Sequence, residues 1–242
     1  MPTVVGQHAV REALRAGRAI EEVHIQQGGE RHHGAILDLC RKAGVAVRVT
    51  PRPALDRLAG GAVHQGIVAV VAAQAYTALD DVLVRLSQAD KPGLLVVLDG
   101  VEDPHNLGAV IRTAEAAGAH AVIIPERRAA GLTPVAAKAA AGALEYLPVC
   151  RVTNINRTLD ELKEQNYWVV GVDERGKNFR EIDYRGGCVL VLGAEGHGLH
   201  QLVRQKCDFL AAIPAAGKVG TLNVSVAAGI VLFEALKQRV SS

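Results

Sequence analysis

The sequence predicts an α/β fold in which a largely parallel sheet carries helices on both faces. Short apolar runs typical of buried parallel strands, such as LLVVL at 94–98 and VLVL at 189–192, recur along the chain. They alternate with segments of helical periodicity, the order of elements that builds a parallel sheet. The 242 residues and the 49% hydrophobic content suffice for one large domain, or for a small domain followed by a medium-sized one.

The first 72 residues predict a small α/β module. Helices are expected at 6–16, at 32–42 and from Pro53, and strands at 20–26, 45–50 and 66–72. Residues 73–93 differ in composition, with Ala, Asp, Ser and Gln around a weak helical segment at 79–87 and with Lys-Pro-Gly at the end. This change predicts a linker at 73–93, so that the second domain covers residues 94–242.

The second domain is expected to alternate strands with helices. The strands are predicted at 94–98, 121–124, 147–152, 168–172, 189–192 and 209–213, and the helices at 107–117, 134–143, 154–165, 199–206 and 222–239. A polar excursion without a predicted element covers 173–187.

Three polar loops directly follow apolar runs in this domain. They read DGVEDPHNLGAVIR at 99–112, GAEGHGL at 193–199 and IPAAGKVGTLNVS at 213–225. Because ligands bind at the carboxyl ends of the strands in open α/β sheets, the loops predict a ligand site at that edge.

The third loop combines free backbone groups with polar side chains. One proline and two glycines between residues 214 and 220 keep it out of helix and sheet, which leaves N–H and C=O groups free to bind a ligand. Thr221, Asn223 and Ser225 then bring three hydrogen-bonding side chains to the start of the last helix, where Thr221 or Asn223 can serve as the N-cap. Taken alone, the stretch fits a well-capped C-terminal helix equally well.

The sequence disfavours several classes of protein. No apolar run reaches the roughly 18 residues that span a bilayer, and the N-terminus lacks the basic start and apolar core of a signal peptide, so we expect a cytoplasmic protein that does not enter the membrane. The four cysteines are scattered and the histidine pairs lack companions at ligand spacing, so no metal site is expected. The missing G-x-G-x-x-G fingerprint after 94–98 argues against a nicotinamide dehydrogenase and against an ordinary Rossmann-type methyltransferase.

Charge is unevenly distributed along the chain. Residues 1–72 hold nine Lys or Arg against six Asp or Glu, whereas the remainder holds eighteen against nineteen. This basic bias fits a phosphate-rich partner, although a solvated basic face explains it almost as well. The same residues contain no aromatic side chain, so RNA binding there would depend on phosphate and polar contacts rather than on stacking.

The three polar loops, with their order and spacing, resemble the three signature motifs of the SpoU (TrmH) branch of SPOUT RNA ribose 2′-O-methyltransferases. The matching residues are Asn106, Gly108 and Arg112, then Gly193, Glu195, Gly196 and Gly198, then Ile213, Pro214, Leu222, Asn223, Val224 and Ser225. The small N-terminal module is similar to the substrate-binding domain of that branch, so the resemblance covers the whole chain. The opening VGQHAV and the ending LFEA are most similar to bacterial 23S rRNA guanosine 2′-O-methyltransferases.

The resemblance implies a pocket for S-adenosylmethionine built from a C-terminal trefoil knot, in which the chain after Gly193 threads through a loop. Gly193, Ile213 and Leu222 would contact the cofactor, largely through backbone groups. Thr221 and Ser225 would contact the substrate. Thr221 stands where serine is common and keeps the hydroxyl, and Ala215 stands where methionine is frequent.

The catalytic residues implied by the resemblance are Asn106, Arg112, Glu195 and Asn223. Arg112 is the family's candidate for activating the ribose hydroxyl, but a guanidinium stays protonated in ordinary surroundings, so Arg112 acts either as the base or as a clamp on phosphate or ribose. Glu195 would position Arg112 or share the proton. Without the motifs, Arg112 would be read as a surface arginine and Glu195 as an ion-paired loop carboxylate.

The implied substrate is a guanosine in the peptidyl-transferase region of 23S rRNA. Two alternatives remain: a tRNA ribose methyltransferase of the same branch, since the catalytic motifs do not encode the RNA, and a non-catalytic RNA-binding relative.

A homodimer is expected from the last helix, 222–239, because its apolar residues go most of the way round it. One face can pack on the parent sheet and the rest needs a second partner, and members of the resembled family pair through their knot regions. The alternative is a helix that is buried entirely within one subunit.

Overall fold

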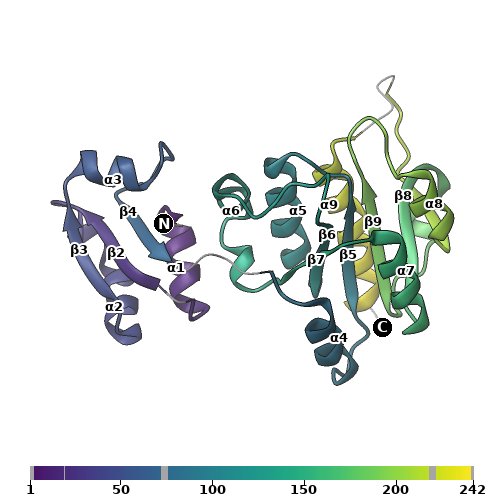
Figure 1. Cartoon of the computed structure of the whole chain (residues 1–242), viewed down its shortest axis with the longest axis horizontal. Coiled ribbons are helices and arrows are strands. Elements are labelled where there is room, and N and C mark those ends of the chain that lie inside the picture. The colour runs from purple at the N-terminus through teal and green to yellow at the C-terminus, as the bar shows by residue number, and fades with distance from the viewer. Residues whose placement is uncertain (1–2, 19, 72–75, 218–221, 241–242) are drawn as a thin grey trace.

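The computed structural model describes residues 3–18, 20–71, 76–217 and 222–240. Within these ranges the chain forms a small N-terminal α/β module and a larger α/β domain, which follow each other along the long axis of the molecule (Figure 1). No helix in the described ranges has the length and apolar character needed to cross a membrane.

The small module is a mixed four-stranded sheet. In sheet order its strands are β1 (Thr3–Val5), β4 (Ile67–Val71), β2 (Ile20–Gln26) and β3 (Ala46–Thr50); β4 is antiparallel to β1 and β2, and β2 is parallel to β3. The helices are α1 (Gln7–Arg15), η1 (Glu30–His33), α2 (Gly34–Ala43) and α3 (Arg52–Leu58). The predicted elements are confirmed to within a few residues. Strand β1 is missing from the prediction, since three residues are too short to show a period.

The larger domain contains a six-stranded sheet in which every neighbouring pair is parallel, as predicted. In sheet order its strands are β10 (Phe209–Ala212), β8 (Trp168–Asn178), β9 (Cys188–Gly193), β5 (Leu94–Asp99), β6 (Ala121–Pro125) and β7 (Val149–Val152). The helical elements are α4 (Leu79–Ser87), α5 (Pro104–Ala116), α6 (Pro134–Ala140), η2 (Ala143–Glu145), α7 (Ile155–Glu164), η3 (Phe179–Glu181), α8 (Gln201–Lys206) and α9 (Val224–Val240).

Helices cover both faces of this sheet, which explains the continuous apolar runs of its strands. Along β5, Leu94, Val96 and Leu98 belong to a core with α5, α6 and α9, whereas Leu95 and Val97 belong to a second core with α4, α7 and α8. Because side chains alternate between faces and both faces are buried, every residue of the run LLVVL must be apolar.

Part of the predicted linker belongs to the larger domain. Val82 and Leu83 of α4 are buried in the second core, and Thr77 forms a parallel bridge with Cys150 of β7. The expectation of a linker over 73–93 is therefore corrected for residues 77–87, which pack on the sheet. The weak periodicity of α4 reflects its small apolar face, which covers only one edge of the sheet.

The polar excursion expected at 173–187 also contains regular structure. Strand β8 runs on to Asn178, and its pairing with β10 shifts register between Leu210 and Ala211. A Cβ atom on Gly176 would lie 2.2 Å from the Leu210 carbonyl oxygen, so only glycine permits this approach of the two backbones. Because its side chains are mostly polar, this end of β8 does not appear as an apolar run in the sequence.

The two parts of the chain touch through α1, β1, α6 and η2. Arg18 and Glu145 form an ion pair of 2.7 Å in which both side chains are mostly buried. The Tyr146 hydroxyl donates a hydrogen bond of 2.7 Å to Glu12 of α1. The contact between the parts therefore includes charged and polar groups that are specifically paired.

Candidate functional site

Three side chains from the three polar loops meet in one cluster at the carboxyl ends of β5, β9 and β10. The Asn106 amide donates to Glu195 Oε1 at 3.0 Å, and the Asn223 amide donates to Asn106 Oδ1 at 3.0 Å and to Glu195 Oε1 at 2.5 Å. We call Asn106, Glu195 and Asn223 the loop triangle. The prediction that the three loops share one edge of the sheet is confirmed by these contacts.

The first corner of the loop triangle is fixed by the start of α5. The Asp103 carboxylate caps the helix by accepting from the His105 N–H at 2.8 Å, and Pro104 occupies the first turn, where no hydrogen bond from its nitrogen is needed. Asn106 follows and is only 7% exposed. A Cβ atom on Gly108 would lie 2.3 Å from the Ala136 carbonyl oxygen, so glycine allows α5 to pack closely on α6.

The second corner is held by a tight turn after β9. Gly198 donates its N–H to the Ala194 carbonyl at 2.9 Å, and Gly196 and Gly198 take left-handed φ angles of 84° and 64°. A Cβ atom on Gly193 would lie 2.1 Å from the carbonyl carbon of Gly198. Glycines therefore fold the turn back on its own strand, with Glu195 at its tip.

The third corner, Asn223, is one of the two residues predicted as the N-cap of the last helix. The side-chain oxygen of Asn223 accepts from the Ser225 N–H at 2.9 Å, and its backbone carbonyl accepts from the Ala227 N–H at 2.9 Å. Asn223 is thus the N-cap, and its amide nitrogen remains available for the loop triangle. The Ser225 hydroxyl donates to Asn223 as well. Thr221, the other candidate cap and an expected substrate contact, lies outside the described residues.

A cavity of about 280 Å³ lies beside the loop triangle. Its lining includes the three expected cofactor contacts, Gly193, Ile213 and Leu222, together with Glu195 and Ala215. The volume is close to the lower end of the range for small-molecule sites, roughly 300–1,000 Å³. The geometry thus brings the residues expected to bind a cofactor close to three of the four residues expected to perform chemistry.

Sequence reasoning missed one wall of this cavity. Asp173, Glu174 and Arg175 of β8 line it, and Arg204 of α8 donates to Asp173 at 2.8 Å and to the Leu199 carbonyl at 3.1 Å. Arg204 therefore ties the turn after β9 to β8. The signal available in the sequence was the position of Asp173, which directly follows the apolar run at 168–172 and so falls on the same edge of the sheet.

A second carboxylate, that of Asp99, stabilises the end of the same turn. Asp99, the last residue of β5, is almost fully buried, and it accepts from the His200 N–H at 2.8 Å and pairs with the His200 ring nitrogen Nδ1 at 2.9 Å. This pair fixes the end of the turn over β5. Across the described residues, no group of three or more His, Cys, Asp or Glu side chains is placed to hold a metal ion.

Arg112 is the one predicted catalytic residue that the loop triangle does not include. It is exposed on α5 and forms no hydrogen bond or ion pair with any described residue. Glu195 instead accepts hydrogen bonds from Asn106 and Asn223. Within a single chain Glu195 makes no described contact with Arg112, so the expectation that Glu195 positions Arg112 or shares the proton stays a prediction.

The cysteines have no part in this site. Burial raises the pKa of the Cys150 thiol to about 11 and that of Cys188 to about 12, and burial raises the pKa of Cys40 as well. Cys207, behind the cavity wall, has a pKa raised to about 12 by the same cause. These thiols stay protonated and unreactive near neutral pH, which agrees with their interpretation as buried thiols.

Comparison with known proteins links both parts of the chain to one family. Residues 93–233 match the model of the SpoU rRNA methylase family, and residues 3–77 match the model of the RNA 2′-O ribose methyltransferase substrate-binding domain. YacO of Bacillus subtilis, assigned to the TrmH family of tRNA/rRNA methyltransferases, is 44% identical over 238 residues, which cover 98% of this chain and 95% of YacO. A TrmH-family relative from Staphylococcus haemolyticus is 43% identical over 240 residues, with 98% and 95% covered.

Solved structures agree with this relationship over almost the full length. The SpoU methyltransferase AviRb of Streptomyces viridochromogenes, in complex with AdoMet, superposes with a TM-score of 0.82 at 27% identity, covering 99% of this chain and 91% of AviRb. An AdoMet-bound rRNA methyltransferase of Sinorhizobium meliloti gives a TM-score of 0.75 at 27% identity, with 97% and 86% covered. The chain therefore belongs to the SpoU (TrmH) family of RNA methyltransferases.

Proposed function

We propose that this protein transfers the methyl group of S-adenosylmethionine to a ribose 2′-hydroxyl in structured RNA. The observation that carries the proposal is the position of the loop triangle beside the cavity that Gly193, Ile213 and Leu222 line. The finer assignment, from the resemblance to bacterial 23S rRNA guanosine 2′-O-methyltransferases, is a guanosine in the peptidyl-transferase region of 23S rRNA, modified in the cytoplasm. A tRNA ribose is the alternative within the same family.

The residues around the cavity suit such a cofactor. Apolar side chains from Leu192, Ile213 and Leu222 form one side and can pack on a purine ring, whereas Asp173 and Glu174 offer carboxylate oxygens to hydroxyl or ammonium groups. Gly193 leaves no room for a side chain between β9 and the turn that follows it. In a SpoU-type knot the chain after Gly193 would thread through a loop.

The bound cofactor supplies an electrophilic methyl group on a sulfonium sulfur. The chain must then hold the ribose hydroxyl in line with that methyl group and accept the hydroxyl proton as the new O–CH₃ bond forms. Glu195 fits the second task, because both amides of the loop triangle donate to its Oε1 and no described residue donates to its Oε2. The two amides hold the carboxylate in one orientation and leave one oxygen to face the substrate.

Arg112 fits the role of a clamp better than that of a base. It is exposed and forms no hydrogen bond or ion pair with a described residue, so its N–H donors can bind a ligand. A guanidinium can instead hold a phosphate or ribose oxygen with two parallel hydrogen bonds. We assign this contact to Arg112: the Arg112 of one copy of the chain holds RNA that is bound in the active site of a second copy.

A homodimer through α9 supports this shared site. Val231 and Leu232 are 0% exposed and face the protein's own core, whereas Val226 and Phe233 are 50% and 49% exposed on the opposite side of the helix. With Leu222 and Ile230 they form an apolar stripe at helical spacing, which starts at the cavity. A second copy of the same stripe is the partner that we propose, since isologous pairing would bury both.

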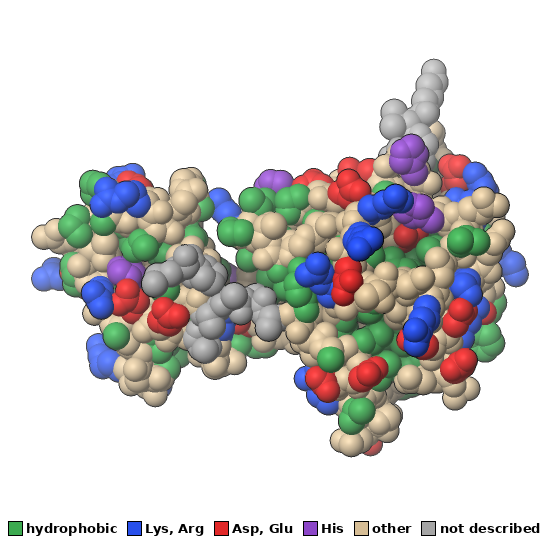
Figure 2. Space-filling view, in the orientation of Figure 1, with side chains coloured by type: hydrophobic (Ala, Val, Ile, Leu, Met, Phe, Trp, Pro, Cys, Tyr) green, Lys and Arg blue, Asp and Glu red, His purple; other side chains and the backbone are tan. Residues whose placement is uncertain are grey.

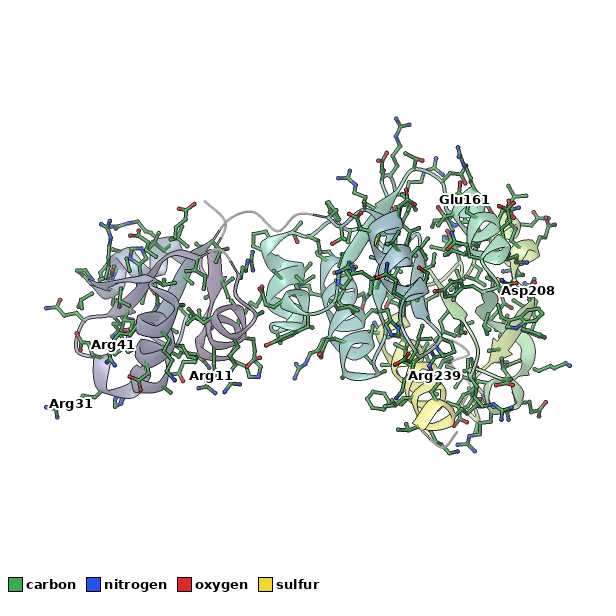
Figure 3. The ribbon with its side chains drawn as sticks, turned by 90° about the horizontal axis from the view of Figure 1, so that it is seen from below. Arg11, Arg31, Arg41, Glu161, Asp208 and Arg239 are labelled. Carbon is green, nitrogen blue, oxygen red and sulfur yellow. The ribbon has the colours of Figure 1, made fainter. Side chains whose placement is uncertain are left out.

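The small module is proposed to select the RNA. Its arginines lie mostly on the surface, and Arg31 and Arg41 stand at the end of the module that is farthest from the larger domain (Figure 3). In Figure 2, Lys, Arg and His side chains lie at the upper edge of the larger domain, interspersed with Asp and Glu side chains. Basic groups on both parts fit one polyanionic substrate that spans them.

The proposal is tested with the purified full-length protein. Calorimetry should detect binding of S-adenosylmethionine and no binding of nicotinamide dinucleotides. Incubation with unmodified transcripts of 23S rRNA and of tRNA, followed by mapping of 2′-O-methyl groups, identifies the substrate. Cofactor binding without methylation of either RNA would indicate a non-catalytic relative, and the absence of cofactor binding would refute the proposal.

A further inference from the structure

The cationic side chains of the larger domain fall into two groups. In the first, each cation is paired with a carboxylate, and these pairs are Arg157–Glu161, Lys163–Asp208, Arg185–Asp183, Arg204–Asp173, Lys206–Asp160 and Lys237–Glu234. In the second group no ion pair with a described residue is formed; three of its members are Arg151 on β7 and Arg127 and Arg128, which follow the neighbouring strand β6. Paired cations need no further partner, whereas a local group of unpaired ones attracts an anionic ligand.

We propose that Arg127, Arg128 and Arg151 bind the phosphate backbone of the RNA between the small module and the active site. We call these three residues the arginine strip. The inference rests on the proposed RNA substrate and adds the path by which that substrate reaches the loop triangle.

The pairing of β6 with β7 places Arg151 beside the end of β6, directly before the segment that carries Arg127 and Arg128. Arg151 lies opposite Ile124 in the register, and it donates a hydrogen bond of 3.4 Å to the carbonyl of Glu126, the residue that precedes Arg127. The side chains of all three arginines are exposed. The exposed Glu126 carboxylate offsets one of their three charges, so the strip keeps a net positive charge.

Both ends of the arginine strip lie next to functional parts of the molecule. At one end, the Arg151 guanidinium stacks 5.1 Å from the ring centroid of Tyr76, which directly follows the segment that joins the two parts of the chain. At the other end, the Ala130 N–H donates to the Val101 carbonyl at 2.8 Å, at the start of the loop that carries Asn106. An RNA strand held by the small module therefore crosses the arginine strip before it reaches the loop triangle.

The chemistry of the arginine strip favours RNA phosphate over other anions. Guanidinium groups bind phosphate with two parallel hydrogen bonds, and the neighbouring positions suit successive groups of one backbone. Arg128 also has a φ angle of +56°, a left-handed conformation that is unfavourable for residues other than glycine. This conformation allows a test with little risk to the fold, since glycine accepts the same backbone angle.

The test compares two double variants of the full-length protein. Arg127→Ala with Arg128→Gly removes two charges from the arginine strip, and Arg185→Ala with Lys206→Ala removes two paired charges near the opposite ends of the strands. The equilibrium constant for an unmodified 23S rRNA transcript is measured by filter binding over a series of KCl concentrations. Binding of S-adenosylmethionine is measured by calorimetry for each protein.

The strip variant is expected to bind the RNA about 10-fold or more weakly near physiological salt. The slope of log K against log salt should become shallower by roughly 1.4–1.8, because each lost phosphate contact contributes about 0.7–0.9. Cofactor affinity should stay unchanged, and the control variant should match the wild type. Equal RNA affinity and slope for the strip variant and the wild type would overturn the inference, as would an equal loss in the control variant.

These outcomes are separate from failure of the proposed function. If the wild-type protein neither binds nor methylates RNA, the proposed substrate is wrong and the inference falls with it. If the wild type methylates RNA and the strip variant does so with the same affinity and slope, only the arginine strip is refuted. If the strip variant loses affinity for heparin but keeps its affinity for the RNA, the arginine strip binds another polyanion. That result would also refute the inference.

Discussion

The small module and the larger domain both contain polar networks, but they build them differently. In the small module His24 pairs with Thr50 and Glu22 at 2.9 Å each, and Arg48 also pairs with Glu22. All four residues lie on the adjacent strands β2 and β3. In the larger domain the loop triangle joins three loops whose residues are separated by 28 to 117 positions.

This difference separates a structural network from a candidate catalytic one. Neighbours on paired strands satisfy each other as a direct result of the register, so the network of the small module needs no ligand to explain it. The loop triangle requires three chain segments to converge beside a cavity, and it leaves one carboxylate oxygen without a described donor. Convergence of this kind is typical of a site that acts on a ligand.

The largest effect is expected when Arg112 is removed. The Arg112→Ala variant should lose roughly 10²- to 10³-fold in single-turnover methyl transfer, the range for removing one preorganised hydrogen-bond donor from a site. It should keep its affinity for S-adenosylmethionine, because Arg112 does not line the cavity. Quenched-flow methylation assays and calorimetry measure the two quantities.

Mixing variants tests whether Arg112 serves the second copy. A mixture of Arg112→Ala and Glu195→Ala proteins, each inactive alone, should regain a substantial fraction of activity, because one of the two sites in the mixed dimer is then intact. If the mixture stays inactive although mixed dimers form, Arg112 acts within its own chain.

The Gly193→Ala substitution is expected to weaken the binding of S-adenosylmethionine about 100-fold. The added Cβ atom would lie 2.1 Å from the carbonyl carbon of Gly198 and 2.4 Å from the Leu199 nitrogen, so the turn after β9 must shift. A displacement of about 1 Å in a site commonly costs about 10²-fold. Calorimetry with S-adenosylmethionine measures the loss, and circular dichroism shows whether the fold is kept.

Gly217→Ala is the matched control for Gly193→Ala. Gly217 lies in the third polar loop, and an added Cβ atom there would have no atom of the described residues within 4 Å. Its affinity for S-adenosylmethionine should change by less than about 3-fold, a difference of less than 1 kcal/mol. Equal affinity losses in the two variants would show that the close approach at Gly193 is not the cause.

The smallest effect on activity is expected when the contact between the small module and the larger domain is weakened. Arg18→Ala leaves the buried Glu145 carboxylate without its 2.7 Å partner, so the parts should separate and let the carboxylate hydrate rather than unfold. We expect a few-fold rise in KM for RNA with kcat and cofactor affinity unchanged, and a larger radius of gyration in small-angle scattering. The exchange Arg18→Glu with Glu145→Arg should restore both values at least in part. An unchanged KM and radius in Arg18→Ala would show that the ion pair does not hold the parts together.

The sequence by itself determined the local features of this protein. Runs such as LLVVL must be apolar at every position because both faces of the parallel sheet are buried, so the strands and the fold class could be predicted. The glycines after β9 and the polar residues before α9 marked the loops of the site, since their effect on the backbone is local. The short strand β1 and the polar end of β8 escaped prediction because they show no apolar period.

Only the tertiary structure decided which of these features come together. The order β10-β8-β9-β5-β6-β7 places the loops after β5, β9 and β10 at one edge, and strand order depends on contacts between distant segments that no local pattern records. On α9 nearly every position is apolar, so the sequence could not show that Val231 and Leu232 face the core while Val226 and Phe233 face outward. Packing alone separates these faces.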